Sequence, residues 1–496
     1  MRSNRSEESK YMTSPATKSN ESTKLDPAVI KIAAVVVLGA IMSILDTTVV
    51  SVAQNTFQDE FNTDQAGSAW TMTGYTLALA AVIPLSSWAA SRFGTKKVYL
   101  VSLVLFVLGS VLCALAWNIA SLVFFRVLQG FGGGMLMPIG MMILTKAAGP
   151  ARVGSVMAVL GIPMLLGPIL GPIIGGALIE YASWHWIFLI NVPIGAAAFL
   201  YSYWILPKDT ETSRPSFDFI GLLLLSPGLA LFLFGISSST EEGTFMTPKV
   251  LIPAVIGLIL VIGFVFHALR ARNPLLDLRL FTNGTLSMSV ITMTLFMIAF
   301  FGAMLLFPQY YIGVRGETTL LTGLLIAPQG IGAMLTMPIA GRLTDKQGPG
   351  KMVLPGIVLI AIGLGAFIFV GPDTSYWLLG AALFVQGLGM GMTMMPIMSA
   401  ALATLSAKQV PDGSTLMNVV QQAAGSIGTA IISVILANNI KGAVQDPAGI
   451  SGAFGTTFIV STVLIALCLI PAFFLPRKRI VNQDSDEEAK APVIMH

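Results

Sequence analysis

Two charged side chains lie inside long apolar stretches of the sequence, and they are the first candidates for chemistry. Asp46 is the only acid well inside such a stretch, and Arg126 is the only base. An ionised group inside a membrane is costly, so a carboxylate there is by default a functional residue. Expected helix geometry places both side chains about 10 Å from the same membrane face. We therefore expect them to form an ion pair, because a buried arginine without a partner is expensive.

A carboxylate held between the attraction of an arginine and the cost of burial can exchange a proton for a substrate. The alternative is a static salt bridge between two helices.

The two cysteines and three histidines show no disulfide framework or metal-ligand spacing. No phosphate-binding GxxxxGK[ST] motif and no catalytic constellation occurs in the sequence. The residues therefore predict neither an enzyme nor an ATP-driven pump. We expect no cofactor, and we expect protons to be the coupling ion.

The composition predicts a polytopic membrane protein. Of the 496 residues, 55% are hydrophobic and only 10% are charged, whereas soluble domains carry about 25% charged residues. This composition excludes a soluble enzyme, a disordered chain and a nucleic-acid-binding module. We expect an all-α membrane fold and not a β-barrel, because the apolar stretches are too long for barrel strands. Fourteen stretches have spanning length: they lie at 30–53, 68–90, 98–117, 119–145, 154–180, 185–206, 217–238, 249–269, 285–313, 318–341, 352–371, 374–404, 412–439 and 453–475.

The basic residues predict how the chain is oriented. Of the 28 lysines and arginines, 24 fall in segments on the side of both termini, and only Lys249, Arg315 and Lys441 fall on the opposite side. Cytoplasmic loops carry the excess of basic residues. We therefore expect a multi-pass protein of the plasma membrane with both termini in the cytoplasm.

The chain also repeats internally. PLSSWAASRFGTKK at 84–97 aligns with PIAGRLTDKQGPGK at 338–351, and Gln129-Gly130 aligns with Gln386-Gly387. Parallel repeats with a binding site between them are a transporter architecture. The expected parts are a disordered N-terminal tail (1–28), a six-helix bundle (29–206), two additional helices with linkers (207–284), a second six-helix bundle (285–475) and a C-terminal tail (476–496).

The sequence resembles the fourteen-helix branch of the drug/proton antiporters of the major facilitator superfamily. The resemblance rests on LDTTVV at 45–50, RVLQGFGGG at 126–134, GPILGPIIGG at 167–176, WHWIFLINVPIG at 184–195, PLLDLRLF at 274–281 and the two repeated loops. It implies two pseudo-symmetric halves around a central cavity. It also implies proton-coupled export of amphipathic, hydrophobic, cationic compounds by alternating access, with Asp46 and Arg126 serving proton coupling.

The resemblance also assigns a conformational helix and two gates. The helix at 154–180 carries the antiporter motif, and the alternative is that its small residues serve packing alone. The residues concerned are Gly167, Pro168, Gly171, Pro172, Gly175 and Gly176. The expected cytoplasmic gates contain Arg92, Gly94 and Lys96 in the first loop and Gly341, Asp345 and Gly348 in the second. Ser91 stands where the family usually has an acid, which puts a salt bridge in the first gate in doubt.

Further polar residues in the apolar stretches are candidates for the substrate cavity: Gln54, Asn55, Tyr75, Gln129, Gln309, Tyr310, Gln329, Asn418, Gln421 and Gln422. The expected partners are hydrophobic small molecules, protons and membrane lipids, without nucleic acid, and the expected state is a monomer. Two other functions stay open at this point. One is the export of lipid or lipid-like molecules, and the other is a sensor or scaffold that transports nothing.

Overall fold

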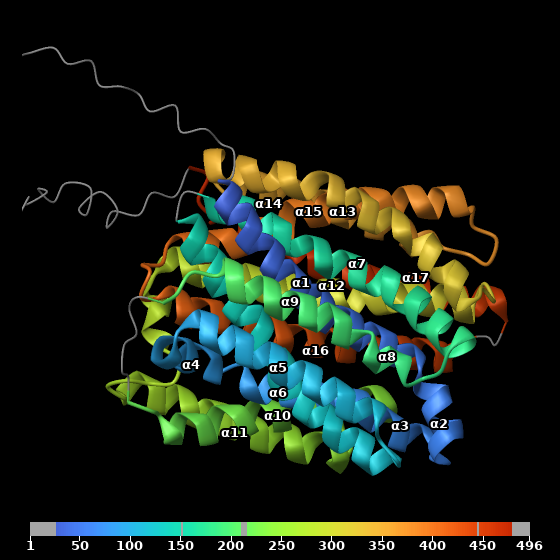
Figure 1. Cartoon of the computed structure of the whole chain (residues 1–496). Coiled ribbons are helices and arrows are strands. Elements are labelled where there is room, and N and C mark those ends of the chain that lie inside the picture. Colours follow the sequence, from blue (N-terminus) through green and yellow to red (C-terminus); the bar gives the residue numbers. More distant parts are fainter. Residues whose placement is uncertain (1–25, 150–151, 210–215, 444–445, 479–496) are drawn as a thin grey trace, which may run out of the picture.

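The computed structural model describes residues 26–149, 152–209, 216–443 and 446–478, and these form one bundle of long helices without any β-strand (Figure 1). The helices are α1 (Pro27–Val52), α2 (Gln54–Phe61), α3 (Gln65–Val82), α4 (Leu85–Phe93), α5 (Thr95–Ala114), α6 (Ile119–Ala148), α7 (Val153–Tyr181), α8 (Trp186–Leu189), α9 (Asn191–Ile205), α10 (Phe219–Glu242), α11 (Pro248–Arg270), η2 (Leu278–Thr282), α12 (Gly284–Gly313), α13 (Thr319–Gln347), α14 (Gly350–Ala366), η3 (Phe367–Phe369), α15 (Tyr376–Ala403), α16 (Val410–Gly442), α17 (Pro447–Leu467) and α18 (Leu469–Ala472).

The predicted all-α membrane fold is confirmed. Each of the fourteen predicted spans coincides with one helix or with two consecutive helices. Among the described residues, 12 helices are long and apolar enough to cross a membrane, and α3 and α4 together form one further candidate that is bent by 55°. α7, with 29 residues, occupies the remaining predicted span. The number of crossings and the division into two six-helix bundles with two extra helices stay predictions.

Helix starts are set by local side chains. Asp64 accepts a hydrogen bond from the backbone N of Gly67 (2.8 Å) at the start of α3. Asn118 and Ser121 form a reciprocal capping box at the start of α6, the helix that carries Arg126. Such caps satisfy backbone N–H groups that have no partner within the helix. They fix where α6 begins and therefore how deep its arginine lies.

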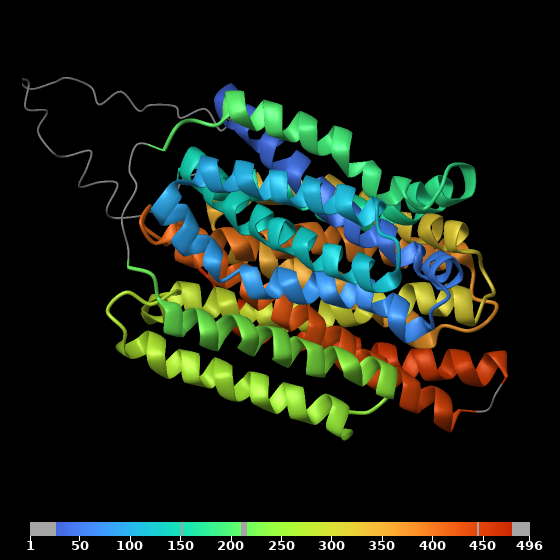
Figure 2. The ribbon, with the colours of Figure 1, turned by 60° about the horizontal axis from the view of Figure 1, so that its bottom comes forward.

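The two additional helices lie at one edge of the bundle. α10 and α11 run side by side in both views (Figures 1 and 2). α10 packs on α3 from the first half and on α16 from the second, whereas α11 packs mainly on α10. Asp218 joins their ends through His267 Nε2 (2.8 Å) and the backbone N of Leu275 (2.9 Å). The pair therefore lies at the periphery and bridges the two halves along that edge.

α7 connects the helix that carries Asp46 to the second half. It packs along α1 on one side and along α13 and α15 on the other. A Cβ atom built on Gly167 would overlap the side chain of Ile44, and one on Gly171 would overlap both Cβ and Oγ1 of Thr48. The Thr48 Oγ1 donates a hydrogen bond to the carbonyl of Gly167 (3.1 Å). The glycines of the α7 motif therefore allow close approach to α1, as small-residue helix faces do in membranes.

This packing predicts different outcomes for two neighbouring glycines of α7. Gly171→Ala forces α1 and α7 apart, because the new methyl overlaps a Cβ atom that side-chain rotation cannot move. We expect it to cost about 1–3 kcal/mol of unfolding free energy. Gly176→Ala is the control, since no atom lies within 4 Å of its added Cβ. Denaturant unfolding in mixed micelles measures both, and equal stability of the two variants would contradict this packing.

Candidate functional site

The structure brings Asp46 of α1 and Arg126 of α6 into an ion pair. Arg126 Nη1 lies 2.6 Å from Asp46 Oδ2, and both side chains have 0% exposure. The residues are 80 positions apart in the sequence. The expected pairing of the two lone charges is thus present, and their role in proton coupling stays a prediction.

Two amide side chains complete the surroundings of the carboxylate. Gln129 Nε2 and Asn191 Nδ2 each donate to Asp46 Oδ1 at 2.8 Å. Gln129 Oε1 also accepts from Arg126 Nη1 (2.7 Å), so the glutamine bridges both members of the pair. Asn191 Nδ2 donates further to Ser110 Oγ (3.0 Å). The anionic carboxylate therefore receives donors from α6 and α9, and the network reaches α5.

The arginine is held by other groups on its far side. Its Nε donates to the carbonyl of Thr71 (3.0 Å), and its Cζ lies 4.0 Å from the centre of the Tyr75 ring. The Tyr75 hydroxyl in turn lies 3.2 Å from Ser43 Oγ. Arg126 Nη2 is buried and has no hydrogen-bond partner among the described residues. The guanidinium is thus fixed by a carbonyl, an aromatic face, the Gln129 amide oxygen and one carboxylate, and its Nη2 group has no partner among the described residues.

The hydrogen bonds around Asp46 and Arg126 connect five helices. The hydrogen bonds to the carboxylate are charge-assisted, which makes them the stronger kind. A buried arginine without its partner is strongly destabilising. Loss of the charge on Asp46 would therefore unbalance contacts that reach α1, α3, α5, α6 and α9.

Sequence reasoning located the pair and missed part of its surroundings. Gln129 and Tyr75 were predicted to line the substrate cavity; both contact Arg126, and their role in a cavity stays a prediction. Asn191, Ser110 and Thr71 were not predicted. Asn191 lies in LINVPIG, so its position within a quoted motif was the available signal. Ser110 and Thr71 are small polar residues in apolar helices and gave none.

The other predicted cavity residues do not form one cluster of contacts. Gln54 donates to Thr71 Oγ1 (3.1 Å), next to the ion pair. Tyr310 donates to the carbonyl of Gly371 (2.7 Å), and Asn418 to the carbonyl of Ser414 (2.8 Å). The remaining five differ in burial: exposed Asn55 and Gln309, half-buried Gln421 and Gln422, and buried Gln329.

The second half lacks a counterpart of the charged pair. The internal repeat aligns Gln386 of α15 with Gln129. The same alignment pairs Leu383 with Arg126. Gln386 is fully buried, and neither its Nε2 nor its Oε1 has a hydrogen-bond partner among the described residues. The polar centre of the first half is therefore represented in the second half by an amide alone.

The second predicted gate joins the two halves. Asp345, near the end of α13, accepts hydrogen bonds from the backbone N of Gly154 (2.8 Å) and of Ser155 (2.9 Å) and from Ser155 Oγ (2.6 Å). A carboxylate is favourable at a helix start, and this one caps α7 from the other half. Gly341 lies against the backbone of Gly154, where a Cβ would lie 2.6 Å from its carbonyl oxygen. Gly348 has a φ of +93° at the end of α13.

The first predicted gate uses a different acid. Ser87 of α4 donates a hydrogen bond to Asp412 in the first turn of α16. The carboxylate is therefore on α16 and not on the gate helix α4. Gly94 has a φ of +87° and adjoins Asp209, whose carboxylate accepts from the backbone N of Lys96 (3.0 Å). Arg92 is exposed in the last turn of α4. Both cross-half contacts therefore take their acid from the second half, Asp345 from α13 and Asp412 from α16.

The fold, with its two contacting halves and one buried ion pair in an apolar bundle, is that of a membrane transporter and not of an enzyme. The model of the Major Facilitator Superfamily matches residues 36–429, and the chain belongs to this family. It is 47% identical to the "Multidrug resistance protein B homolog" of Mycobacterium tuberculosis over 494 residues, which cover 92% of each chain. It is 30% identical to the "Multidrug export protein EmrB" of Escherichia coli over 404 residues, covering 81% of this chain and 79% of that one.

Solved structures agree with the fold. The human organic anion transporter MFSD10 aligns with a TM-score of 0.62 at 16% identity, covering 89% of this chain and 100% of that one. A double tryptophan mutant of XylE aligns with a TM-score of 0.66 at 14% identity, covering 93% and 98%. At such identities the likeness concerns the fold alone.

The ion pair predicts strong coupling between its members. Asp46→Asn leaves a buried arginine without a counter-charge, and we expect a loss of about 3–5 kcal/mol of unfolding free energy. Arg126→Met leaves the carboxylate equally unpaired. The double variant should lose clearly less than the sum of the two, which denaturant unfolding of all three variants measures as a coupling energy. Strictly additive losses would contradict a direct pair.

The cap on α7 predicts that Asp345 keeps the contact of α7 with α13 closed. Met337 of α13 is fully buried against Gly161 of α7, so a cysteine placed there reports on opening. Asp345→Ala removes hydrogen bonds to a charged group worth about 1.5–3 kcal/mol each, and we expect maleimide labelling of Met337→Cys to accelerate at least about tenfold. Asp373→Ala, an exposed acid in another loop, is the control. Unchanged labelling after Asp345→Ala would show that the cap does not hold this contact.

Proposed function

We propose that this protein is a proton-coupled exporter of amphipathic, hydrophobic, cationic compounds that works by alternating access in the plasma membrane. The observation that carries the proposal is the Asp46–Arg126 ion pair, which is fully buried inside an apolar bundle. The names of the relatives support the export of drugs: one is a multidrug resistance protein homolog and another a multidrug export protein. Small molecules, protons and membrane lipids are the partners, and the transporter acts as a monomer with cytoplasmic termini.

In the proposed cycle Asp46 takes up a proton from outside and gives it up when a cationic substrate arrives from the cytoplasm. A cation and a proton compete for one carboxylate because either neutralises the same charge. Proton entry supplies about 2.3 kcal/mol per charge for each 100 mV of membrane potential. Arg126 keeps the unprotonated carboxylate paired, and its unused Nη2 group is available to a new acceptor when the pair opens.

The packing of α7 gives a route from the ion pair to the rest of the molecule. Ile44 and Thr48, on either side of Asp46 in α1, contact the glycines of α7. α7 itself lies along α13 and is capped by Asp345. A shift of α1 on protonation therefore acts on a helix that contacts the second half. Rocking of the halves about this contact is the movement that alternating access needs.

Proton exchange in inside-out membrane vesicles tests the proposal. The vesicles are energised to an acid interior, ethidium is added, and a fluorescent pH probe records dissipation of the gradient. We expect substrate-dependent proton efflux from the wild type, and its loss in Asp46→Asn, because asparagine carries no exchangeable proton. Glu60→Gln, an exposed acid on α2, is the matched control and should behave as the wild type.

Two further arms separate failure of folding from failure of coupling. Asp46→Asn/Arg126→Gln removes both charges together and is expected to fold better than the single variant while still losing efflux. Efflux that survives in either variant would leave antiport in place and overturn Asp46 as the coupling residue. No efflux with a panel of lipophilic cations, and no substrate-induced proton release by the pure protein, would favour lipid export or a scaffold.

A further inference from the structure

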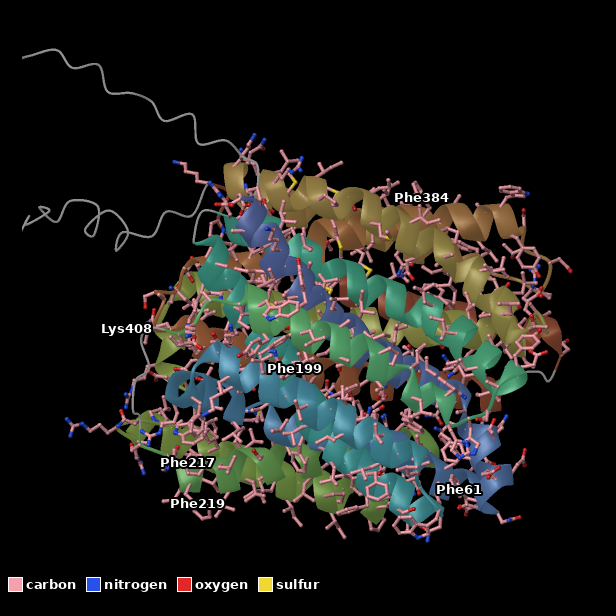
Figure 3. All side chains as sticks on the ribbon, viewed as in Figure 1. Phe61, Phe199, Phe217, Phe219, Phe384 and Lys408 are labelled. Carbon is pink, nitrogen blue, oxygen red and sulfur yellow. The ribbon has the colours of Figure 1, made fainter. Side chains whose placement is uncertain are left out.

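A groove with a basic mouth lies on the outside of the bundle between α5 and α9. Its volume is about 520 Å³, and its lining consists of Phe93, Lys96, Lys97, Leu100, Val101, Val104, Leu105, Phe199, Lys208 and Asp209. Phe199 lies where α9 faces α5 (Figure 3). The groove is separate from the Asp46 network. We propose that it binds one anionic phospholipid, with the phosphate at the lysines and an acyl chain along α5.

The lysines at the mouth differ in what they are bound to. Lys96 Nζ donates hydrogen bonds to the carbonyls of Tyr203 (2.7 Å) and Leu206 (2.6 Å) at the end of α9. Lys97 and Lys208 are exposed, and the described residues offer neither of them an ion-pair partner. Two ammonium groups are thus available to a phosphate.

The one acid at the mouth does not cancel this charge. Asp209 Oδ1 accepts from Thr95 Oγ1 (2.8 Å), and its Oδ2 accepts from the backbone N of Lys96 (3.0 Å). Both oxygens are therefore used to cap the start of α5. A neighbouring hollow of about 180 Å³ shares Lys96, Lys208 and Asp209 and adds Lys146 from the last turn of α6. Among the described residues, the groove and this hollow together are lined by four lysines and one carboxylate.

The depth and lining of the groove suit a lipid. Lys97 lies at the end of α5 that faces the predicted cytoplasmic side, and Leu105 lies eight residues further on, about 12 Å deeper at the helical rise. The side chains between them along the groove are apolar, and Val101 and Val104 are 50% and 41% exposed. A headgroup at the lysines thus leaves its acyl chain against aliphatic side chains. Basic pockets between spanning helices on the cytoplasmic side bind anionic headgroups.

The charge of the mouth also separates this ligand from the proposed substrates. A lipophilic cation entering along the groove would meet three lysines and would be repelled. A zwitterionic lipid would gain less than an anionic one from the same lysines. The inference stands on the groove alone and is independent of the proposed transport function.

Native mass spectrometry of the delipidated full chain in detergent tests the proposal, with phosphatidylglycerol and phosphatidylcholine of the same acyl chains as probes. We expect tighter binding of phosphatidylglycerol by the wild type. Lys97→Gln/Lys208→Gln should weaken it by about fivefold for each lysine. Lys351→Gln/Lys408→Gln removes two exposed lysines outside the groove and should leave binding unchanged; Lys408 lies at the same end of the bundle (Figure 3).

Two additions keep the test decisive. Val104→Trp fills the groove without changing its charge and should also weaken phosphatidylglycerol binding; should this variant not fold, the surface lysine variants alone decide the test. Inorganic phosphate and glycerol phosphate at millimolar concentration should not displace the lipid. Displacement by either would mean a phosphate site without an acyl-chain site. No preference for phosphatidylglycerol, or an equal loss in Lys351→Gln/Lys408→Gln, would overturn the proposal.

Discussion

The cost of burying one charge constrains the centre of this molecule. Arg126 and Asp46 both have 0% exposure and lie 2.6 Å apart, and neither is tolerable in an apolar bundle without the other. The remaining lone pairs and N–H groups of the pair also need partners. Gln129, Asn191 and the carbonyl of Thr71 supply them from α6, α9 and α3. The relative positions of these helices are thus tied to the contacts of the ion pair.

Much of this centre could be predicted from the sequence because charges are rare there. Asp46 and Arg126 were expected to meet because of their equal depth, their opposite charge and the cost of an unpaired buried arginine. Gln129 lies three residues after Arg126, so helical periodicity places it beside the arginine. Asn191 could not be placed, because the face that a polar residue presents depends on how the helices pack. For the same reason the sequence could not separate exposed Asn55 from buried Gln329.

The two cross-half contacts show another limit of sequence reasoning. Asp345 was expected in its gate and is found capping α7. The missing acid at Ser91 suggested a weakened first gate, yet Asp412 provides a carboxylate for Ser87 of the same α4 helix from a position 325 residues away. A pairing over that distance in sequence leaves no local pattern. The internal repeat predicts one acid in each half, whereas both acids of these contacts lie in the second half.

The replacement of Arg126 by Leu383 in the repeat has a consequence for how the duplicated halves differ. Because the described part of the second half has no buried ion pair, loss of the charge on Asp46 would unbalance contacts of first-half helices only. The two duplicates therefore differ in what holds their interiors: an ion pair with its donors in the first, and packing with neutral hydrogen bonds in the second. On α15 the buried polar residues are all neutral, and they include Gln386, Thr393 and Ser399. Gln386, whose amide atoms have no hydrogen-bond partner among the described residues, is a position where an apolar residue of similar size would leave no neighbour without a bond.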